Sequence, residues 1–401
     1  MHLFQGPRFQ LLQKPSFFYY LLSCFLATFG SGLCYILANW LIVSIHSDVM
    51  TVLVMMICFW LPSALLGPYW GVVVDRYSRR WLLFFSNGVR GVMLLGFGWY
   101  FYQHGLSTYA LDILMLLLGC LFGVIFPASV AMVRELVATK DLLYANTTID
   151  IVYEVGNVVG MGSAGFLLMA VSHSMAFTIC GVIFLLAALA LIPIKLRMAE
   201  PRKPSTAMND FVLGMNYLQN NRILALIYII QLLMMVAFMI TPVLIAPFAK
   251  NILHANSLHF GLIESALSMG VIGGGIILPW LTEKQGFVKT LLWFSILLMM
   301  LYVLFPLNTR ISVAAILYFL IGVVLSSWSL IMTKAQSVTE PEYQGRVQSV
   351  FSSISSLLIL STYLVIAVGG HFIYLRWLYL FPAILMTVAI FVIWKLRRIM
   401  D

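Results

Sequence analysis

The chain has 401 residues, of which 62% are hydrophobic and only 9% are charged, and its formal net charge is +9. An ordinary soluble domain has about 25% charged residues, so this composition excludes a soluble globular protein. The apolar runs are long and unbroken, which indicates α-helical membrane spans. A transmembrane β-barrel would instead show alternating segments of about ten residues.

Twelve apolar runs are long enough to be membrane spans, because one crossing needs about 20 mostly apolar residues. The N-terminus lacks the short apolar core and small-residue cleavage site of a signal peptide, so we expect the first run to be a retained helix. Very short turns separate the fifth run from the sixth and the eleventh from the twelfth, which predicts antiparallel pairs. The expected helices cover residues 17–45, 50–74, 81–102, 109–133, 147–171, 175–194, 223–249, 258–281, 289–307, 311–333, 347–370 and 374–394.

The basic residues predict the orientation of these helices. Cytoplasmic loops of membrane proteins are enriched in Lys and Arg. With both termini in the cytoplasm, 19 of the 23 Lys and Arg residues fall on the inner side and three on the outer side, while Arg90 lies within a span. The net charge is therefore a topology signal and does not imply a nucleic-acid partner. We expect a monomer in the inner (plasma) membrane.

No segment indicates catalysis, a cofactor or a metal site. The five cysteines all fall inside apolar runs, in a spacing that suits neither a disulfide framework nor zinc. The only run of three glycines, at residues 273–275, lies inside a span and lacks the Lys-Ser/Thr that follows a phosphate-binding loop. Transport powered by ATP within this chain is thus excluded.

The segment 195–222 divides the expected spans into two sets of six, within residues 1–194 and 223–401. The two sets carry similar loops: "GVVVDRYSRR" (71–80) follows the second span, and "PWLTEKQGFVK" (279–289) follows the eighth. Two six-helix repeats are the architecture of major facilitator transporters. The predicted fold is therefore an all-α polytopic membrane protein with twelve transmembrane helices in two six-helix repeats.

The loop at 71–80 also resembles the signature G-x-x-x-D-R-x-G-R-R of the major facilitator superfamily, with Ser78 in place of a glycine. In that family the loop stabilises the outward-facing state, and the resemblance implies the same gating role here. The alternative is a simple cluster of inner-side positive charge. The matching residues are Gly71, Asp75, Arg76, Arg79 and Arg80.

The stretch "FPASVAMVRELVATKDLLYANTTI" (126–149) resembles one branch of the same superfamily, which contains the enterobactin exporter and the macrolide-efflux proteins. The resemblance implies proton-coupled export of an amphipathic small molecule, such as a siderophore, a macrolide or another drug. Lysophospholipid transporters share part of this stretch, so lipid transport is an alternative. A transporter-like sensor or assembly factor without flux is an alternative of another class.

The expected fifth helix carries two distinct stripes. Asp150, Glu154 and Asn157 are spaced i, i+4, i+7 and so share one face. Carboxyl groups inside a membrane are costly and usually functional, so we expect Asp150 and Glu154 to face the central cavity and carry the coupled proton. The alternative is a structural ion pair with Arg90 or Arg134.

The second stripe is made of small residues, which allow close helix packing. "GNVVGMGSAG" (156–165) resembles the antiporter signature G-x-x-x-G-P-x-x-G-G, with Met161 in place of the proline and Ala164 in place of a glycine. Generic helix packing is the alternative. The glycines of this stripe are Gly156, Gly160, Gly162 and Gly165.

Other polar residues lie in the expected spans. Arg90 is near the midplane and needs an anion, either a carboxylate of this protein or one of the substrate. Asp112 and Glu264 lie near the outer ends of their helices. We expect them to be interfacial and solvated, or else outer-gate or coupling residues. On the first helix, a substrate-cavity role is the hypothesis for Tyr35, Asn39 and Trp40.

Overall fold

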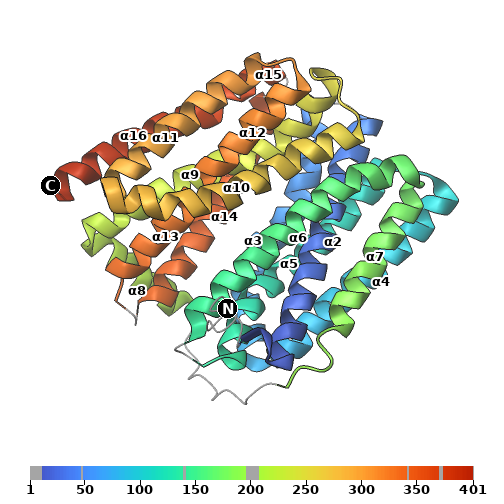
Figure 1. Cartoon of the computed structure of the whole chain (residues 1–401), viewed down its shortest axis with the longest axis horizontal. Coiled ribbons are helices and arrows are strands. Elements are labelled where there is room, and N and C mark those ends of the chain that lie inside the picture. Colours follow the sequence, from blue (N-terminus) through green and yellow to red (C-terminus); the bar gives the residue numbers. More distant parts are fainter. Residues whose placement is uncertain are drawn as a thin grey trace, which may run out of the picture. The chain divides into compact units, whose positions relative to one another are not determined.

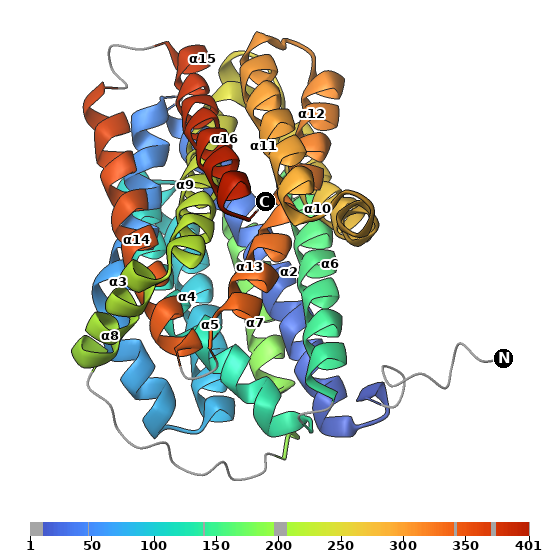
Figure 2. The ribbon, with the colours of Figure 1, turned by 90° about the vertical axis from the view of Figure 1, so that its left-hand side faces the viewer.

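The computed structural model describes residues 11–46, 48–138, 141–195, 207–340, 343–369 and 374–400, and these are helical almost throughout, with no strand among them (Figures 1 and 2). The prediction of an all-α protein is therefore confirmed. The first six long helices are α2 (Pro15–Ile45), α3 (Val49–Arg76), α4 (Arg79–His104), α5 (Thr108–Leu136), α6 (Leu142–Ala170) and α7 (His173–Leu189). The remaining elements are α8 (Ala207–Asn220), α9 (Arg222–Asn251), α10 (Ser257–Gln285), α11 (Phe287–Leu304), η3 (Phe305–Leu307), α12 (Ile311–Leu325), α13 (Ser327–Val338), α14 (Gln344–Gly369), α15 (Leu375–Leu378) and α16 (Leu380–Met400).

Eleven helices of the described chain are long and apolar enough to cross a membrane. The remaining expected span, at 175–194, forms the shorter apolar helix α7 of 17 residues. Its N-cap is Ser172, whose hydroxyl accepts a hydrogen bond from the Met175 amide at 3.3 Å. Seventeen residues are at the short end of the range that spans a bilayer.

The expected tenth span, at 311–333, is divided into α12 and α13. A run of serines lies at the division, and each of their hydroxyls bonds a carbonyl three residues back: Ser326 to Val323 and Ser327 to Val324, both at 2.7 Å. Such side-chain bonds compete with the helical ladder and bend or interrupt helices. The segment expected as the inner loop 195–222 also differs from the prediction, because its second part forms the helix α8.

The chain consists of two compact units, and the boundary between them crosses two helices. One unit comprises Met1–His46, Val54–Lys203 and Asn256–Ser265, and the other comprises Ser47–Leu53, Pro204–Ala255 and Ala266–Asp401. The N-terminal turns of α10 therefore belong to the first unit. The division into repeats at 1–194 and 223–401, joined by 195–222, stays a prediction.

Within the first unit, α2 packs along α6 and α7, and α4 packs along α7 and α5. Apolar side chains from the N-terminal part of α2, the C-terminal part of α5 and the start of α6 form a core, which includes Phe17, Met132 and Ile149. Within the second unit, α9 and α11 both pack against α16, and α8 packs against α14. Four aromatic rings, those of Phe248, Phe305, Tyr318 and Tyr379, meet in its core at centroid distances of 5.1 to 5.4 Å.

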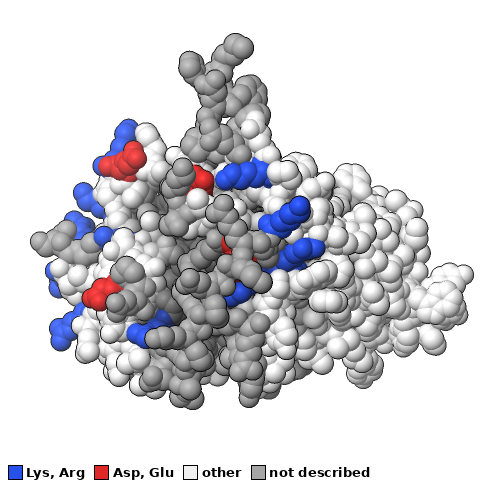
Figure 3. All heavy atoms as spheres, turned by 90° about the horizontal axis from the view of Figure 1, so that it is seen from below, with Lys and Arg blue, Asp and Glu red and all other residues white. Residues whose placement is uncertain are grey.

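Basic side chains outnumber acidic ones on the surface seen from below. That view shows Lys and Arg at many places, with fewer Asp and Glu (Figure 3). Basic residues occur at helix ends: Arg79 and Arg80 begin α4, and Arg397 and Arg398 lie in the last turn of α16. Basic residues at helix ends are of the kind that the positive-inside rule describes. The placement of both termini in the cytoplasm stays a prediction.

Candidate functional site

The start of α4 is tied to the ends of two neighbouring helices. The Arg79 guanidinium forms a salt bridge with Glu135 at the end of α5, with 3.3 Å between Nη1 and Oε1. Arg80 donates hydrogen bonds to the carbonyls of Leu191, at 3.0 Å from Nε, and Ile192, just after α7. A cation at a helix C-terminus also interacts favourably with the helix dipole. The side chains of Asp75 and Arg76, and the surroundings of Gly71, lie outside the described residues.

The Arg79–Glu135 pair is largely buried, with side-chain exposures of 23% and 10%. Burial raises the pKa of Glu135, and the Arg79 guanidinium opposes that rise. The pair therefore joins α4 to α5 at a place where an uncompensated charge would be costly. The gating role of this loop stays a prediction.

We expect Arg79→Gln to destabilise the protein by about 1–2 kcal/mol, because it leaves the Glu135 carboxyl without its charged partner. Thermal unfolding of the detergent-solubilised chain measures the change. The double variant Arg79→Gln/Glu135→Gln should be more stable than the sum of the single changes predicts, since residues in contact are not additive. Strict additivity would mean that the two charges contribute independently.

The acidic face of α6 has no basic partner among the described residues. Glu154 is half-buried and Asp150 is exposed, and the two carboxyl-bearing residues are about one helical turn apart. The ion pairs of the described chain are Lys14–Asp141 and Arg79–Glu135, and neither involves this face. The pairing of Asp150 or Glu154 with Arg90 that the sequence left open is thus absent, while the Arg134 side chain lies outside the described residues.

Arg90 lies in the core of the first unit, at 6% exposure. Its guanidinium is 5.4 Å from the centre of the Phe184 ring on α7, a cation–π distance, and Cys34 on α2 lies nearby. Its Nε atom has no hydrogen-bond acceptor within the described part of the chain. The expected carboxylate partner of Arg90 is therefore not found there.

The small residues of α6 contact two different helices. A side chain at Gly160 would meet the backbone of α2 at Phe29 and Leu33, and Gly156 likewise faces α2. Gly165 faces α10 instead: a Cβ there would lie 2.6 Å from the Cα of Leu258. Gly162 is next to Ser265 on α10. At 100° per residue, Gly162 and Gly165 are on the side of α6 away from Gly156 and Gly160, so the predicted single stripe is two contact faces.

The N-terminal segment of α10, residues 257–265, is held against α2 and α6. The Ser257 hydroxyl donates to the Gly165 carbonyl at 3.3 Å, and the Ser265 hydroxyl donates to the Val158 carbonyl at 3.2 Å. The rings of Trp40 and Phe260 stack at a centroid distance of 5.5 Å. We call residues 257–265 the α10 docking segment.

This contact brings together two predicted site residues that are 229 positions apart. The Tyr35 hydroxyl donates to Oε1 of Glu264 over a long distance of 3.4 Å. Glu264 is only 3% exposed, so the expectation that it is interfacial and solvated is wrong. The close approach of α10 to α2 and α6 is the physical reason. The sequence signal for this approach is a small residue at every fourth position, at Ser257, Gly261 and Ser265, which the hydropathy of the span does not register.

The other predicted cavity and gate residues, Asn39, Trp40 and Asp112, lie in three different environments. Asn39 is buried, and its Nδ2 donates to the Tyr35 carbonyl at 2.8 Å, while its Oδ1 has no partner in the described chain. Trp40 is engaged with Phe260. Asp112 is half-buried, and its Oδ1 also has no hydrogen-bond partner among the described residues. No group of three or more His, Cys, Asp or Glu side chains in the described residues is arranged to hold a metal ion.

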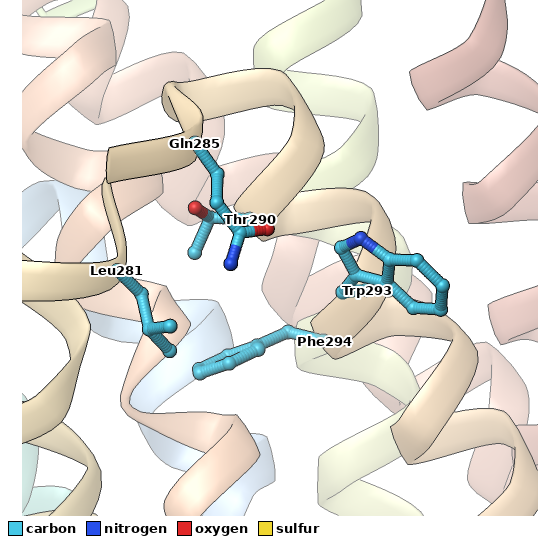
Figure 4. Close-up of a pocket in the computed structure, with 5 residues that line it drawn as sticks. All are labelled: Leu281, Gln285, Thr290, Trp293 and Phe294. Carbon is cyan, nitrogen blue, oxygen red and sulfur yellow. The ribbon is translucent and has the colours of Figure 1, made fainter. Parts of the chain in front are cut away.

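A small hollow lies between the end of α10 and the start of α11. It has a volume of about 180 Å³ and is lined by Leu281, Gln285, Thr290, Trp293 and Phe294. The Phe294 ring points toward Leu281, and Thr290 lies below Gln285 (Figure 4). Sites for drug-sized ligands usually have about 300–1,000 Å³, so this hollow is too small to be the substrate site.

Comparison with known proteins identifies the family. The description of the Major Facilitator Superfamily matches residues 20–362 of the chain. The chain belongs to this superfamily. Its relatives include the putative bacilysin exporter BacE of Bacillus subtilis, 26% identical over 349 residues that cover 77% of this chain and 81% of BacE. The uncharacterized MFS-type transporter YfiS of Bacillus subtilis is 23% identical over 342 residues, covering 81% of this chain and 79% of YfiS.

Solved structures show the same superfamily fold. The nucleoside transporter NupG has a TM-score of 0.72 at 13% identity, covering 95% of this chain and 98% of NupG. A bacterial homologue of the iron transporter ferroportin, solved in its inward-facing state, has a TM-score of 0.71 at 17% identity, with coverages of 95% and 98%. The predicted major facilitator fold is thus confirmed, and the protein is a multi-pass membrane transporter whose relatives are named as exporters.

Proposed function

We propose that this superfamily member is a proton-coupled secondary transporter of the inner membrane, which exports an amphipathic small molecule by alternating access. The acidic face of α6 carries the proposal. Asp150 and Glu154 lie in a membrane-spanning helix, with no cation paired to them in the described chain. A buried carboxyl is far less costly as the neutral acid than as the anion. Binding and release of a proton therefore change the free energy of burying this face of α6.

The direction and the substrate class rest on the relatives and on the stretch 126–149. Three matched proteins are named as putative bacilysin exporters, which supports export. The resemblance of 126–149 to the enterobactin and macrolide branch supports a siderophore, a macrolide or another drug as the substrate. The partners in this proposal are the bilayer, the small molecule and protons, and the protein acts as a monomer.

Lipid transport is a second candidate, because the first unit has an apolar groove. The groove lies between α2 and α6, has a volume of about 300 Å³ and is lined by apolar side chains, among them Phe18, Phe25 and Ile151. A lysophospholipid acyl chain would fit such a lining. A sensor or assembly factor without flux is the remaining alternative.

Transport in everted membrane vesicles tests the proposal. Overexpression of the chain should raise proton-driven uptake of a fluorescent drug substrate into the vesicles, and a protonophore should abolish that uptake. Overexpression in cells should in parallel raise tolerance to macrolides or increase the siderophore in the medium. Uptake of labelled lysophospholipid, with no drug or siderophore effect, would support the lipid candidate. No flux of any of these would contradict a transporter of this substrate class.

A further inference from the structure

The α10 docking segment holds a carboxyl group that the proposed coupling by Asp150 and Glu154 does not use. Glu264 lies in the contact among α2, α6 and α10 and is 3% exposed. Its one hydrogen bond among the described residues comes from Tyr35. The described ion pairs do not include it, so its charge would be uncompensated within this contact.

The three helices of this contact supply no Lys or Arg near Glu264. Neither α2 nor α6 contains Lys or Arg, and the single Lys of α10, Lys284, is at the opposite end of that helix. The titratable groups of these helices include the Tyr35 hydroxyl on α2, Asp150 and Glu154 on α6, and His259 on α10 itself, while Arg90 of α4 lies beside Cys34 of α2. An ionised Glu264 would therefore be buried without a paired cation among the described residues, which is a costly arrangement.

The packing of the segment shows that it docks closely. Gly165 and Gly261 let the backbones of α6 and α10 meet, since a Cβ on Gly261 would lie 2.7 Å from the Met161 carbonyl oxygen. Two serine hydroxyls bond carbonyls of α6 across the contact. Water that could solvate a carboxylate is excluded by such packing, so docking and the ionised state of Glu264 oppose each other.

We infer that Glu264 is a proton-binding site of the transport cycle, whose protonation is required for the α10 docking segment to close onto α2 and α6. Tyr35 donates to Oε1 of the carboxyl, and Oε2 carries the proton. In the predicted topology this segment is on the outer side of the membrane. A proton bound from outside would therefore be enclosed when the segment docks, which is the inward direction that export requires.

The geometry also places Glu264 near the level of the acidic face along α6. Ser265, the residue after Glu264, bonds the Val158 carbonyl. Glu154 precedes Val158 by four residues, which is about 6 Å along the helix, and at i and i+4 the two share one face. Glu264 and Glu154 thus lie within about one helical turn of the same level, and the second acid is on the cytoplasmic side. This inference rests on the proposed proton-coupled function and assigns the acid that binds the proton on the outer side.

Distance measurements between spin labels test the inference without substrate or gradient. Labels on Leu262→Cys of α10 and Met169→Cys of α6, both exposed positions, report whether the segment is docked, in the full-length chain with Cys58 and Cys120 replaced by Ala. We expect one short distance at pH 5 and an added population of longer distances at pH 9. Glu264→Gln should keep the short distance at both pH values, because the amide is neutral and its oxygen still accepts from Tyr35.

Glu283→Gln is the control, since Glu283 is an exposed carboxyl on the same helix, at the end of α10 far from the contact. It should leave the pH dependence unchanged. An unchanged distance between pH 5 and pH 9 in the otherwise unsubstituted chain would overturn the inference, whatever the fate of the variants. So would a pH-dependent distance that persists in Glu264→Gln. If the distances overturn the inference while efflux is proton-driven, the proposed function still holds. If docking depends on Glu264 but no efflux occurs, only the proposed function is contradicted.

Discussion

Glu154→Gln is expected to abolish proton-driven efflux. Glutamine preserves the size of the side chain and removes its ability to bind and release a proton. The acidic face of α6 then loses the carboxyl that is closer to the middle of the helix. We expect the initial rate of efflux driven by a pH gradient to fall at least about tenfold, a loss equivalent to about 1.4 kcal/mol in the barrier. Substrate exchange without a gradient should continue, because the substrate contacts are unchanged.

The comparison of gradient-driven efflux with exchange separates a coupling role from a structural one. A structural acid would impair both processes, since helix packing would suffer. Glu283→Gln is the matched control, because Glu283 is an exposed carboxyl at the far end of α10. Full gradient-driven efflux in Glu154→Gln would end the assignment of this residue as a proton carrier. Asp150→Asn is expected to have a smaller effect, since Asp150 is exposed whereas Glu154 is half-buried.

The positions of the helices along the chain follow largely from the sequence, because a membrane span needs a certain length and hydropathy. The expected runs correspond to the observed helices, but most of the loop expected at 71–80 is helical, because α3 continues to Arg76 and α4 begins at Arg79. The break between α12 and α13 was not expected. A hydropathy average does not show that serine hydroxyls bond their own backbone. The residues around Ser326 and Ser327 are mostly apolar, so the run appears continuous.

The surroundings of the intramembrane polar residues could not be derived in the same way. A carboxyl near a helix end is solvated or buried according to which helix packs over it, and this depends on contacts between segments far apart in the chain. Glu264 is buried because Gly165 and Gly261 allow α10 to approach α6. A carboxylate partner was expected for Arg90, but the Phe184 ring and Cys34 lie near its guanidinium instead.

Gly160→Ala is expected to destabilise the protein by about 1–3 kcal/mol, because α2 and α6 are in backbone contact at this position. An added methyl group would overlap the Phe29 carbonyl oxygen and crowd the Leu33 amide nitrogen, at 3.2 Å. Backbone atoms cannot rotate away as the end of a side chain can, so the two helices must separate. Gly160→Leu should prevent the accumulation of folded protein altogether.

Gly96→Ala gives the matched control for this close approach. Gly96 is also in a membrane-spanning helix, but a Cβ there would have no other atom within 4 Å. Because alanine favours a helix over glycine by up to about 1 kcal/mol, Gly96→Ala should leave the thermal unfolding midpoint unchanged or raise it. Thermal unfolding of both variants in one detergent compares them directly. Equal midpoints would show that α2 and α6 are not in backbone contact at Gly160, and would remove the packing that sets Glu154 on the face turned away from α2.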